Sequence, residues 1–356
     1  MRGSAGDRPR TARRYTCLMR LQGLRVLLAI VEHGSFSEAA LELGVSQSTV
    51  SHGIAELEEE LGVRLLERGR FGAVPTPVGE RVADHARAVE AALAAISQEA
   101  ALHRDELRGE LRVSSIRSMA VHVLAPVMSS LRETHPEVKV TVREVANLAR
   151  EPMAHLRTAR VDVALTMSSL AEDVLYWQLM RDPYVAVVRE EGPVRGDTAS
   201  LRDLVRLPVI VSGGPCSWPI RGALLNVEPT FQPAYEIAED STMIALVARG
   251  LGVALMPALT VDALPPGTRA VPIAERVERS LGVAVLPRSL KTPAVRVFLE
   301  RLREMFPESE VPPLGALHGE GRDLPSDGGE LFEGARHDID GAQVLSDGHA
   351  LRRRVV

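Results

Sequence analysis

The residues of this chain that are best suited to chemistry form an uncharged polar run near the N-terminus. Between positions 46 and 52 the sequence reads Ser-Gln-Ser-Thr-Val-Ser-His, directly after Gly44-Val45. Gln, Ser and Thr side chains hydrogen-bond to base edges and to phosphates. The run therefore predicts a nucleic-acid contact, and its candidate residues are Ser46, Gln47, Ser48, Thr49, Ser51 and His52.

Four polar residues around this run are further candidates for contact with DNA. Two arginines lie in a short stretch with Gly69 and Gly72, where they suit contacts with the phosphate backbone. Two hydroxyl residues precede predicted helices, whose first N–H groups are free to bind phosphate. These four residues are Ser35, Arg68, Arg70 and Thr76.

A second polar group follows the apolar run 111–115 and precedes a predicted helix. Ser115, Arg117 and Ser118 could hold a carboxylate, with Arg117 as its counter-ion. A capping serine and a solvated arginine explain the same residues equally well. Four weaker effector candidates follow other strands or open helices: Asn147, Thr166, Ser212 and Ser241.

The sequence lacks the spacings of metal sites and of enzymes. Cys17 and Cys216 lie far apart and show no CxxC or Cys/His pattern, which fits a reducing cytoplasm. Cys216 could be a redox sensor, but with no basic neighbour or second cysteine nearby in the sequence we favour a plain loop thiol. His33, His122 and His135 are interpreted as structural. We predict no enzyme activity, no metal and no cofactor.

Composition limits the class of protein further. The 356 residues are 45% hydrophobic and carry a net charge of −5, so any attraction to DNA has to be local. The first twenty residues contain six Arg, and no apolar run reaches the ~18 residues of a membrane span. We expect a cytoplasmic protein with no membrane contact, a disordered extension over 1–20 with a native start at Met19, and a disordered tail over 307–356.

Three helices and a hairpin must position the polar run. Apolar spacing predicts helices over 24–33, 35–43 and 46–61, separated by Gly34 and Gly44. Ser35 begins the second helix in a capping-box pattern, and small Ala39 and Ala40 allow it to approach the third helix closely. Residues 64–75 are expected to form a two-stranded hairpin. This is the pattern of a winged helix-turn-helix.

A long helix follows Thr76-Pro77, a strong helix start. It is predicted to run to about Arg108 and would be ~45 Å long. Its apolar residues recur at 82, 86, 89, 93, 96 and 100, with alternating spacings of four and three. Such a seam normally faces a partner helix, so we expect a dimer, although packing on its own chain is the alternative.

From 109 to 306 short apolar runs alternate with amphipathic stretches. The expected strands are 111–115, 138–145, 161–166, 184–188, 209–212, 252–256 and 281–286, and the expected helices include 124–135, 242–249 and 293–305. This alternation favours mostly parallel α/β sheets in two lobes. We place the first lobe at about 109–183 and 284–306, and the second at about 184–283.

Several motifs now stand in a recognisable order. Residues 31–40 read Val-Glu-His-Gly-Ser-Phe-Ser-Glu-Ala-Ala, 45–51 read Val-Ser-Gln-Ser-Thr-Val-Ser, and 76–79 read Thr-Pro-Val-Gly. With 57–68, they resemble the LysR-type transcriptional regulator family. The match is looser at 109–113, 124–126, 135–138, 161–165 and 247–257, so the resemblance covers about 21–306.

The resemblance implies an α+β multidomain protein. Its parts would be a winged helix-turn-helix (21–76), a linker and dimerisation helix (77–108), and a two-lobed, periplasmic-binding-protein-like α/β effector domain (109–306). It implies a dimer or tetramer that binds double-stranded DNA, senses a small, anionic effector between the lobes, and activates or represses nearby genes. RNA polymerase is then a candidate partner.

Two features depart from the family pattern. His52 and Gly53 stand where the family often has Arg followed by Gln or Lys, which puts a base contact by the side chain at 53 in doubt. Residues 21–76 contain four Arg and eight Glu, a net charge of −4, so we expect weak non-specific binding. A solute-binding protein is one rival, but it would leave 21–108 unexplained and would need an export signal. An enzyme that uses the cleft is the other.

Overall fold

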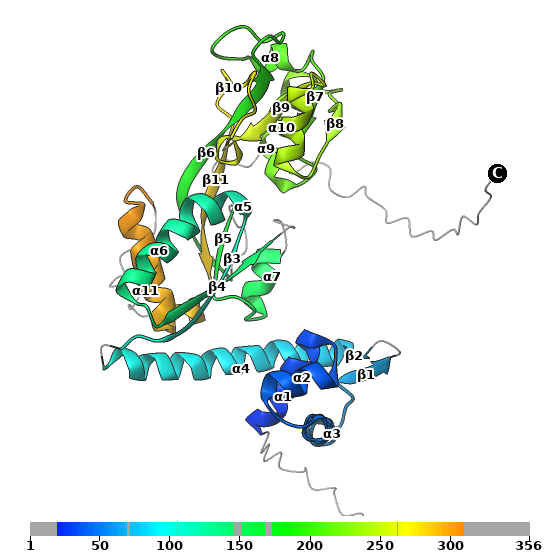
Figure 1. The fold of residues 1–356 in the computed structure, drawn as a ribbon, viewed down its shortest axis with the longest axis vertical. Helices are drawn as coiled ribbons and strands as arrows, with labels where there is room; N and C mark the ends of the chain where they lie inside the picture. The colour runs from blue at the N-terminus through cyan, green and yellow to red at the C-terminus, as the bar shows by residue number, and fades with distance from the viewer. Residues whose placement is uncertain are drawn as a thin grey trace, which may run out of the picture. The chain divides into compact units, whose positions relative to one another are not determined.

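The computed structural model describes residues 20–69, 72–104, 106–145, 151–167, 173–261 and 263–309 (Figure 1). The extension predicted over 1–20 and the tail predicted over 307–356 lie almost entirely outside these residues. Within the described ranges, no helix combines the length and apolarity needed to cross a membrane.

Three short helices form the N-terminal module, as the apolar spacing predicts: α1 (Leu21–His33), α2 (Phe36–Leu43) and α3 (Gln47–Leu61). Gly44 ends α2 with φ +64, a left-handed conformation that suits glycine because it has no Cβ. Ala39, Ala40 and Val50 are buried where α2 meets α3. The tight turn and small residues therefore set the two helices at close range.

A two-stranded hairpin follows α3 and is fastened to the helices at two points. β1 (Leu66–Gly69) pairs antiparallel with β2 (Gly72–Pro75). The Ala73 amide donates to the Gly34 carbonyl over 2.8 Å. The Glu58 carboxylate accepts from the backbone N–H groups of Leu65 and Leu66, at 2.7 and 3.1 Å. The position of the hairpin is thus fixed by α1 and α3 together.

The long helix α4 (Pro77–Leu102) begins at the Thr76 cap, as predicted, but ends about six residues earlier than expected. Its 26 residues span about 39 Å. Its first turns pack on the N-terminal module, because Ala83 and Ala86 belong to the same buried core as α1. Part of the predicted seam therefore contacts the chain itself.

The remaining residues form the α/β region. Its helical elements are α5 (Arg117–Met119), the π-helical turn η1 (Ala120–Leu124), α6 (Ala125–Thr134), α7 (Glu151–Arg157), α8 (Leu201–Leu204), α9 (Trp218–Val227), α10 (Asp240–Ala248) and α11 (Pro293–Met305), with 3₁₀ turns at Pro215–Ser217 (η2), Ala258–Thr260 (η3) and Pro287–Lys291 (η4). Its strands are β3 (Gly109–Ser115), β4 (Val138–Glu144), β5 (Val163–Met167), β6 (Leu175–Arg189), β7 (Val209–Val211), β8 (Tyr235–Glu236), β9 (Val253–Pro257), β10 (Thr268–Pro272) and β11 (Glu278–Val285).

The strands follow the order β4-β3-β5-β11-β6-β9-β7-β8, with β10 on β6. We call β3–β5 with α5–α7 and α11 the first lobe, and β7–β10 with α8–α10 the second lobe; β6 and β11 run between them (Figure 1). Strand β11 pairs antiparallel with β5 over residues 281–285. All of β11, residues 278–285, also pairs antiparallel with the first part of β6.

The expectation of mostly parallel sheets is wrong. β6 and β11 run antiparallel to all their partners, whereas β3, β4 and β5 are parallel to one another, as are β7, β8 and β9. The sheet is mixed because the two strands that connect the lobes run in opposite directions. Strand β6 is also far longer than the predicted 184–188.

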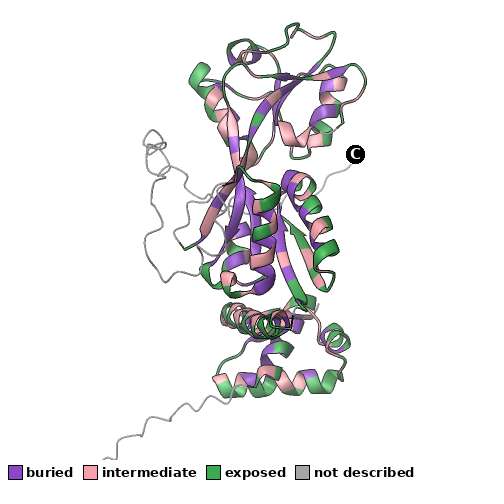
Figure 2. Ribbon diagram, turned by 90° about the vertical axis from the view of Figure 1, so that its left-hand side faces the viewer, coloured by how far each residue is buried: buried purple, intermediate pink, exposed green. Residues whose placement is uncertain are grey.

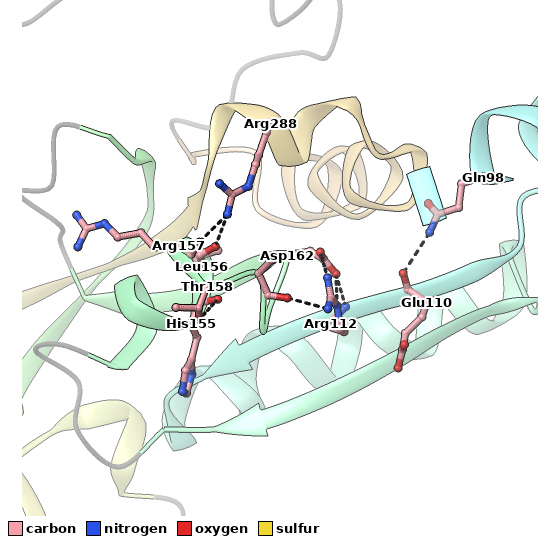
Figure 3. Close-up of polar contacts among 10 residues, drawn as sticks. Gln98, Glu110, Arg112, His155, Leu156, Arg157, Thr158, Asp162 and Arg288 are labelled. Atoms are coloured by element: carbon pink, nitrogen blue, oxygen red, sulfur yellow. Dashed lines mark hydrogen bonds and ion pairs between the residues drawn. The ribbon is translucent and has the colours of Figure 1, made fainter. Parts of the chain in front are cut away.

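Buried residues concentrate on the strands and on the inner faces of the helices (Figure 2). In the first lobe a half-buried ion pair adds to this core: Arg112 Nη2 lies 2.7 Å from Asp162 Oδ1, and Arg112 Nη1 donates to the Ala159 carbonyl (Figure 3). Ala159 has φ +51, which is unusual for a residue with a Cβ. The Arg112 contact holds the turn between α7 and β5 in this conformation.

Candidate nucleic-acid interface and inter-lobe junction

The first turn of α3 presents the predicted polar run to solvent. Ser46 is the N-cap, and its Oγ accepts from the Thr49 amide over 3.2 Å. Gln47, Ser48 and Thr49 are exposed, and so is His52 one turn later, whereas Ser51 is half-buried. The cap already uses Ser46 Oγ. Among the exposed residues of this first turn, Gln47 has the longest side chain.

Of the flanking candidates for DNA contact, Ser35 and Thr76 already form hydrogen bonds within the module. Ser35 Oγ accepts from the amides of Ser37 and Glu38, as an N-cap does. Thr76 Oγ1 accepts from the Gly79 amide over 3.0 Å and donates to the Arg64 carbonyl over 2.9 Å. Both hydroxyls thus hold helix starts in place. The side chain of Arg68 and the whole of Arg70 lie outside the described residues.

Gly53 lies on the side of α3 that faces α1. A Cβ at this position would lie 3.3 Å from Val26 Cγ2 of α1. A Cβ at Gly23 of α1 would meet Leu57 of α3 at 3.5 Å. The two glycines allow α1 and α3 to approach closely. A longer side chain at 53 would therefore enter this contact.

Several acidic residues of the module are already bound within it. Glu42 pairs with His33 at 2.8 Å, and Glu58 binds the start of the hairpin as described. A pocket of about 400 Å³ between α1 and α3 is lined by Arg20, Gln22, Gly23, Gly53, Glu56, Leu57, Glu59 and Glu60. Four glutamates, Glu56, Glu58, Glu59 and Glu60, lie in the second half of α3. Glu56 lies 3.5 Å from His52, so this negative charge extends to one residue of the polar run.

The effector candidates of the first lobe come together at the ends of β3 and β5. Ser115 is fully buried and donates to the Ile116 carbonyl over 3.0 Å. Thr166, near the end of β5, is also buried. Ser118 is buried and binds an arginine described below. Asn147 lies outside the described residues.

Arg117 connects the two lobes by ion pairs. Its guanidinium lies 2.9 Å from Glu239 and 3.5 Å from Asp240, both at the start of α10 in the second lobe. It also lies 3.6 Å from Glu144 of the first lobe. The side chain of Arg117 is 50% exposed, and it also forms ion pairs between the lobes. It is therefore more than the solvated arginine that is one of the two expectations.

The candidates of the second lobe lie on separate elements. Ser212 follows β7, is half-buried, and accepts from the Gly214 amide over 3.4 Å. Ser241 is exposed in the first turn of α10, next to the two carboxylates that bind Arg117. The structure thus brings Arg117, Ser118 and the start of α10 to one junction, while Ser212 stands in a different loop.

A buried ion pair at the same junction is missing from the sequence analysis. Arg279 Nη2 lies 2.7 Å from Asp182 Oδ2, and the two side chains are 1% and 0% exposed. Arg279 also donates to Ser118 Oγ of the first lobe over 2.9 Å. Asp182 accepts from the Leu259 amide of the second lobe over 3.1 Å. The pair therefore joins β6 and β11 to both lobes.

Cys216 has a basic neighbour in space, which corrects the statement made from the sequence. Arg279 Nη1 lies 3.2 Å from Cys216 Sγ. Burial nevertheless raises the pKa of the Cys216 thiol, although Arg279 acts in the opposite direction. Burial also raises the pKa of Tyr184, whose hydroxyl donates to the Cys216 carbonyl. Burial therefore favours the protonated form of the thiol.

Two protein families match the chain in the two regions just described. Residues 21–80 match the family described as bacterial regulatory helix-turn-helix protein, lysR family. Residues 104–307 match the family described as LysR substrate binding domain. The first match contains α1 to the start of α4, and the second contains both lobes.

Individual proteins are similar over most of the chain. The probable HTH-type transcriptional regulator LrrA of Synechococcus elongatus is 38% identical over 291 residues, which are 82% of this chain and 98% of that protein. A probable hydrogen peroxide-inducible genes activator of Mycobacterium leprae is 31% identical over 67% of this chain and 77% of its own length. The structure of a full-length OxyR variant from Pseudomonas aeruginosa superimposes with a TM-score of 0.66 at 25% identity, covering 80% of this chain and 95% of that one.

Proposed function

Because this chain belongs to the LysR family of DNA-binding transcriptional regulators, whose C-terminal domain binds an effector, we propose how its own residues do this work. The first turn of α3 reads base edges, α4 pairs with α4 of a second copy, and the inter-lobe junction binds a small anion. The protein is a regulator and not an enzyme.

The exposed, uncharged start of α3 is the observation that carries the DNA-binding proposal. Gln47 is the first residue of the helix, is exposed, and has an amide that can bind adenine through two hydrogen bonds. Ser48, Thr49 and His52 are exposed beside it. Free backbone N–H groups at the helix start suit a phosphate.

A gel-shift experiment with DNA from upstream of the protein's own gene tests this proposal. The full chain is compared with a chain that lacks residues 1–76 but keeps α4 on the first lobe. We expect the full chain to shift the DNA and the shortened chain to lose binding, because the core of the N-terminal module is removed with it. Equal binding by both chains would contradict the proposal.

The second half of α4 supports pairing with another copy. Val89 and Ile96 are 42% and 67% exposed, and Leu93 between them is half-buried. Their spacing of four and three residues places them on one stripe, which lies C-terminal to the buried Ala83 and Ala86. A dimer through this stripe would present two α3 helices to successive major grooves of a dyad-symmetric site. Two such dimers would form a tetramer.

Ile96→Glu is expected to weaken the dimer strongly, because it places a charge in the centre of an apolar helix pair. We expect the sedimentation coefficient at micromolar concentration to fall toward that of a monomer, while the chain stays folded. Ala94→Glu is the control: it adds the same charge at an exposed position two residues away, which points to a different side of α4, and it should leave the assembly unchanged. A dimer that survives Ile96→Glu with its wild-type dissociation constant would exclude this stripe.

An anionic effector is supported by the contacts of Arg117. Its ion pairs with Glu239 and Asp240 are exposed, and exposed pairs contribute only about 0–1 kcal/mol each. A ligand carboxylate can therefore compete for the guanidinium. Such a ligand would release the second lobe from Arg117, and it would favour the lobe arrangement in which that contact is open. This differential affinity is what regulation requires.

Hydrogen peroxide is the second candidate signal, as the name of the M. leprae relative suggests. The observation that favours it is the contact between Arg279 and Cys216 Sγ. Against it, the raised pKa of Cys216 leaves little thiolate, which is the form that reacts with peroxide. The anionic effector is therefore the better supported proposal.

Two variants of the full chain separate the two signals. In a thermal-shift screen of small mono- and dicarboxylates, a compound at 100 times its Kd should stabilise the protein by about 2.7 kcal/mol. We expect Cys216→Ser to keep this response and Arg117→Gln to lose it. If peroxide instead changes the affinity of the wild type for upstream DNA, and Cys216→Ser abolishes that change, the second candidate is correct.

A further inference from the structure

The last turns of α4 are bound to the first lobe through a buried amide. Gln98 is 2% exposed, and its two amide atoms bind two different elements; Figure 3 shows the contact with Glu110. Its Nε2 donates to the Glu110 carbonyl of β3 over 3.2 Å. Its Oε1 accepts from the Ala294 amide of α11 over 3.1 Å. One side chain thus joins α4, β3 and α11.

The contact of Gln98 with α11 replaces a missing helix cap. Thr292 is the N-cap of α11, but its side chain makes no capping hydrogen bond. The Ala294 amide lies in the first turn of α11, where backbone N–H groups have no partner within the helix. Gln98 supplies that partner from another helix. Removal of its amide would leave a buried donor on α11 without an acceptor.

Neighbouring residues are fitted to this contact. Gly109 has φ +139, and a Cβ there would lie 2.8 Å from Gln98 Nε2. Glu99, next to Gln98, accepts from Arg296 of α11 over 2.9 Å. Ala101 is buried one turn below. The end of α4 is therefore packed on the first lobe by several independent contacts, with the amide of Gln98 at their centre.

We infer that Gln98 is the positioning residue that makes α4 and the first lobe one rigid body, so that lobe motion reaches the DNA-binding module through α4. The same helix packs on α1 through Ala83 and Ala86, about 18 to 22 Å away from Gln98 along its axis. The second lobe is connected to this path through β6, β11 and the junction. This inference rests on the proposed role of the junction in regulation.

The local part of the inference is tested by trypsin on the full chain. Arg104 and Arg108 are exposed between α4 and β3, and cleavage there requires this segment to open. We expect Gln98→Met, which keeps the side-chain volume, to speed cleavage at these two sites about tenfold, because buried hydrogen-bond partners are left unpaired. Ser97→Ala, an exposed neighbour whose hydroxyl binds only within α4, is the control. Cleavage of Gln98→Met at the wild-type rate would overturn the inference.

The transmission of lobe motion is tested by combining two substitutions. Glu239→Lys places a like charge against Arg117 and should change the affinity for upstream DNA by about fivefold or more. In the Gln98→Met background the same substitution should change it less than about twofold. A change of equal size in both backgrounds would overturn the inference. No change in either background would instead contradict the regulatory role of the junction, and the trypsin result would still decide whether Gln98 holds α4.

Discussion

Replacing Arg279 by Met is expected to destabilise the α/β region by about 3–5 kcal/mol. Asp182 would remain at a fully buried position and lose the only cation within ion-pair distance in the described part of the chain. The loss of one partner of a buried pair is therefore far more damaging than its contacts alone suggest. Urea unfolding followed by tryptophan fluorescence measures this effect, since Trp177 and Trp218 both lie in the α/β region.

Two further variants decide whether the buried charge is the cause. Arg279→Met combined with Asp182→Leu removes both charges and should restore most of the lost free energy of unfolding. Arg181→Met breaks the neighbouring pair with Glu278 on the same two strands, where Arg181 is 54% exposed. This control should cost less than about 1 kcal/mol. If Arg279→Met and Arg181→Met are equally mild, the junction does not depend on a buried ion pair.

The second large effect is expected at Gln47. We predict that Gln47→Ala weakens binding to the specific site by about 5- to 150-fold, the range for loss of a bidentate base contact of 1–3 kcal/mol. Binding to unrelated DNA of the same length should change little, because that term depends on phosphate contacts. Titration of both DNAs at one fixed salt concentration gives the two dissociation constants.

The same substitution at Gln22 provides the matched control. Gln22 is exposed on α1 and lines the pocket with Glu56, Glu59 and Glu60. Gln22→Ala should leave both dissociation constants near their wild-type values. An equal loss on specific and unrelated DNA for Gln47→Ala would mean that Gln47 binds the backbone, and its assignment as a base-reading residue would be wrong.

The N-terminal module could be predicted closely from the sequence because its determinants are local. The caps at Ser35, Ser46 and Thr76 and the glycine turn at Gly44 all act within a few residues of chain, and each is found in the structure. The family assignment drawn from these motifs is confirmed by the two family matches. The DNA and effector contacts of individual residues remain predictions.

The inter-lobe junction could not be predicted in the same way. Arg279 and Asp182 are 97 residues apart in the chain, and Arg117 and Glu239 are 122 apart. Each residue alone looks like an ordinary charged position, because pairing at that range depends on the strand order. The full length of β6 could not be predicted because Gln178, Arg181, Asp182 and Pro183 interrupt its apolar pattern, and their partners lie on a distant strand.

Strand β6 has a mechanical consequence for any movement of the lobes. It is one continuous strand of 15 residues, paired with β11 in its first part and with β9 and β10 in its second. With no flexible loop at this crossing, reorientation of the lobes must twist a hydrogen-bonded ribbon, which has one irregularity, between Leu281 and Gly282. Torsion of such a ribbon is elastic and limited in amplitude. We therefore expect ligand binding to rotate the lobes by only a small angle, and we expect this rotation to reverse once the ligand leaves.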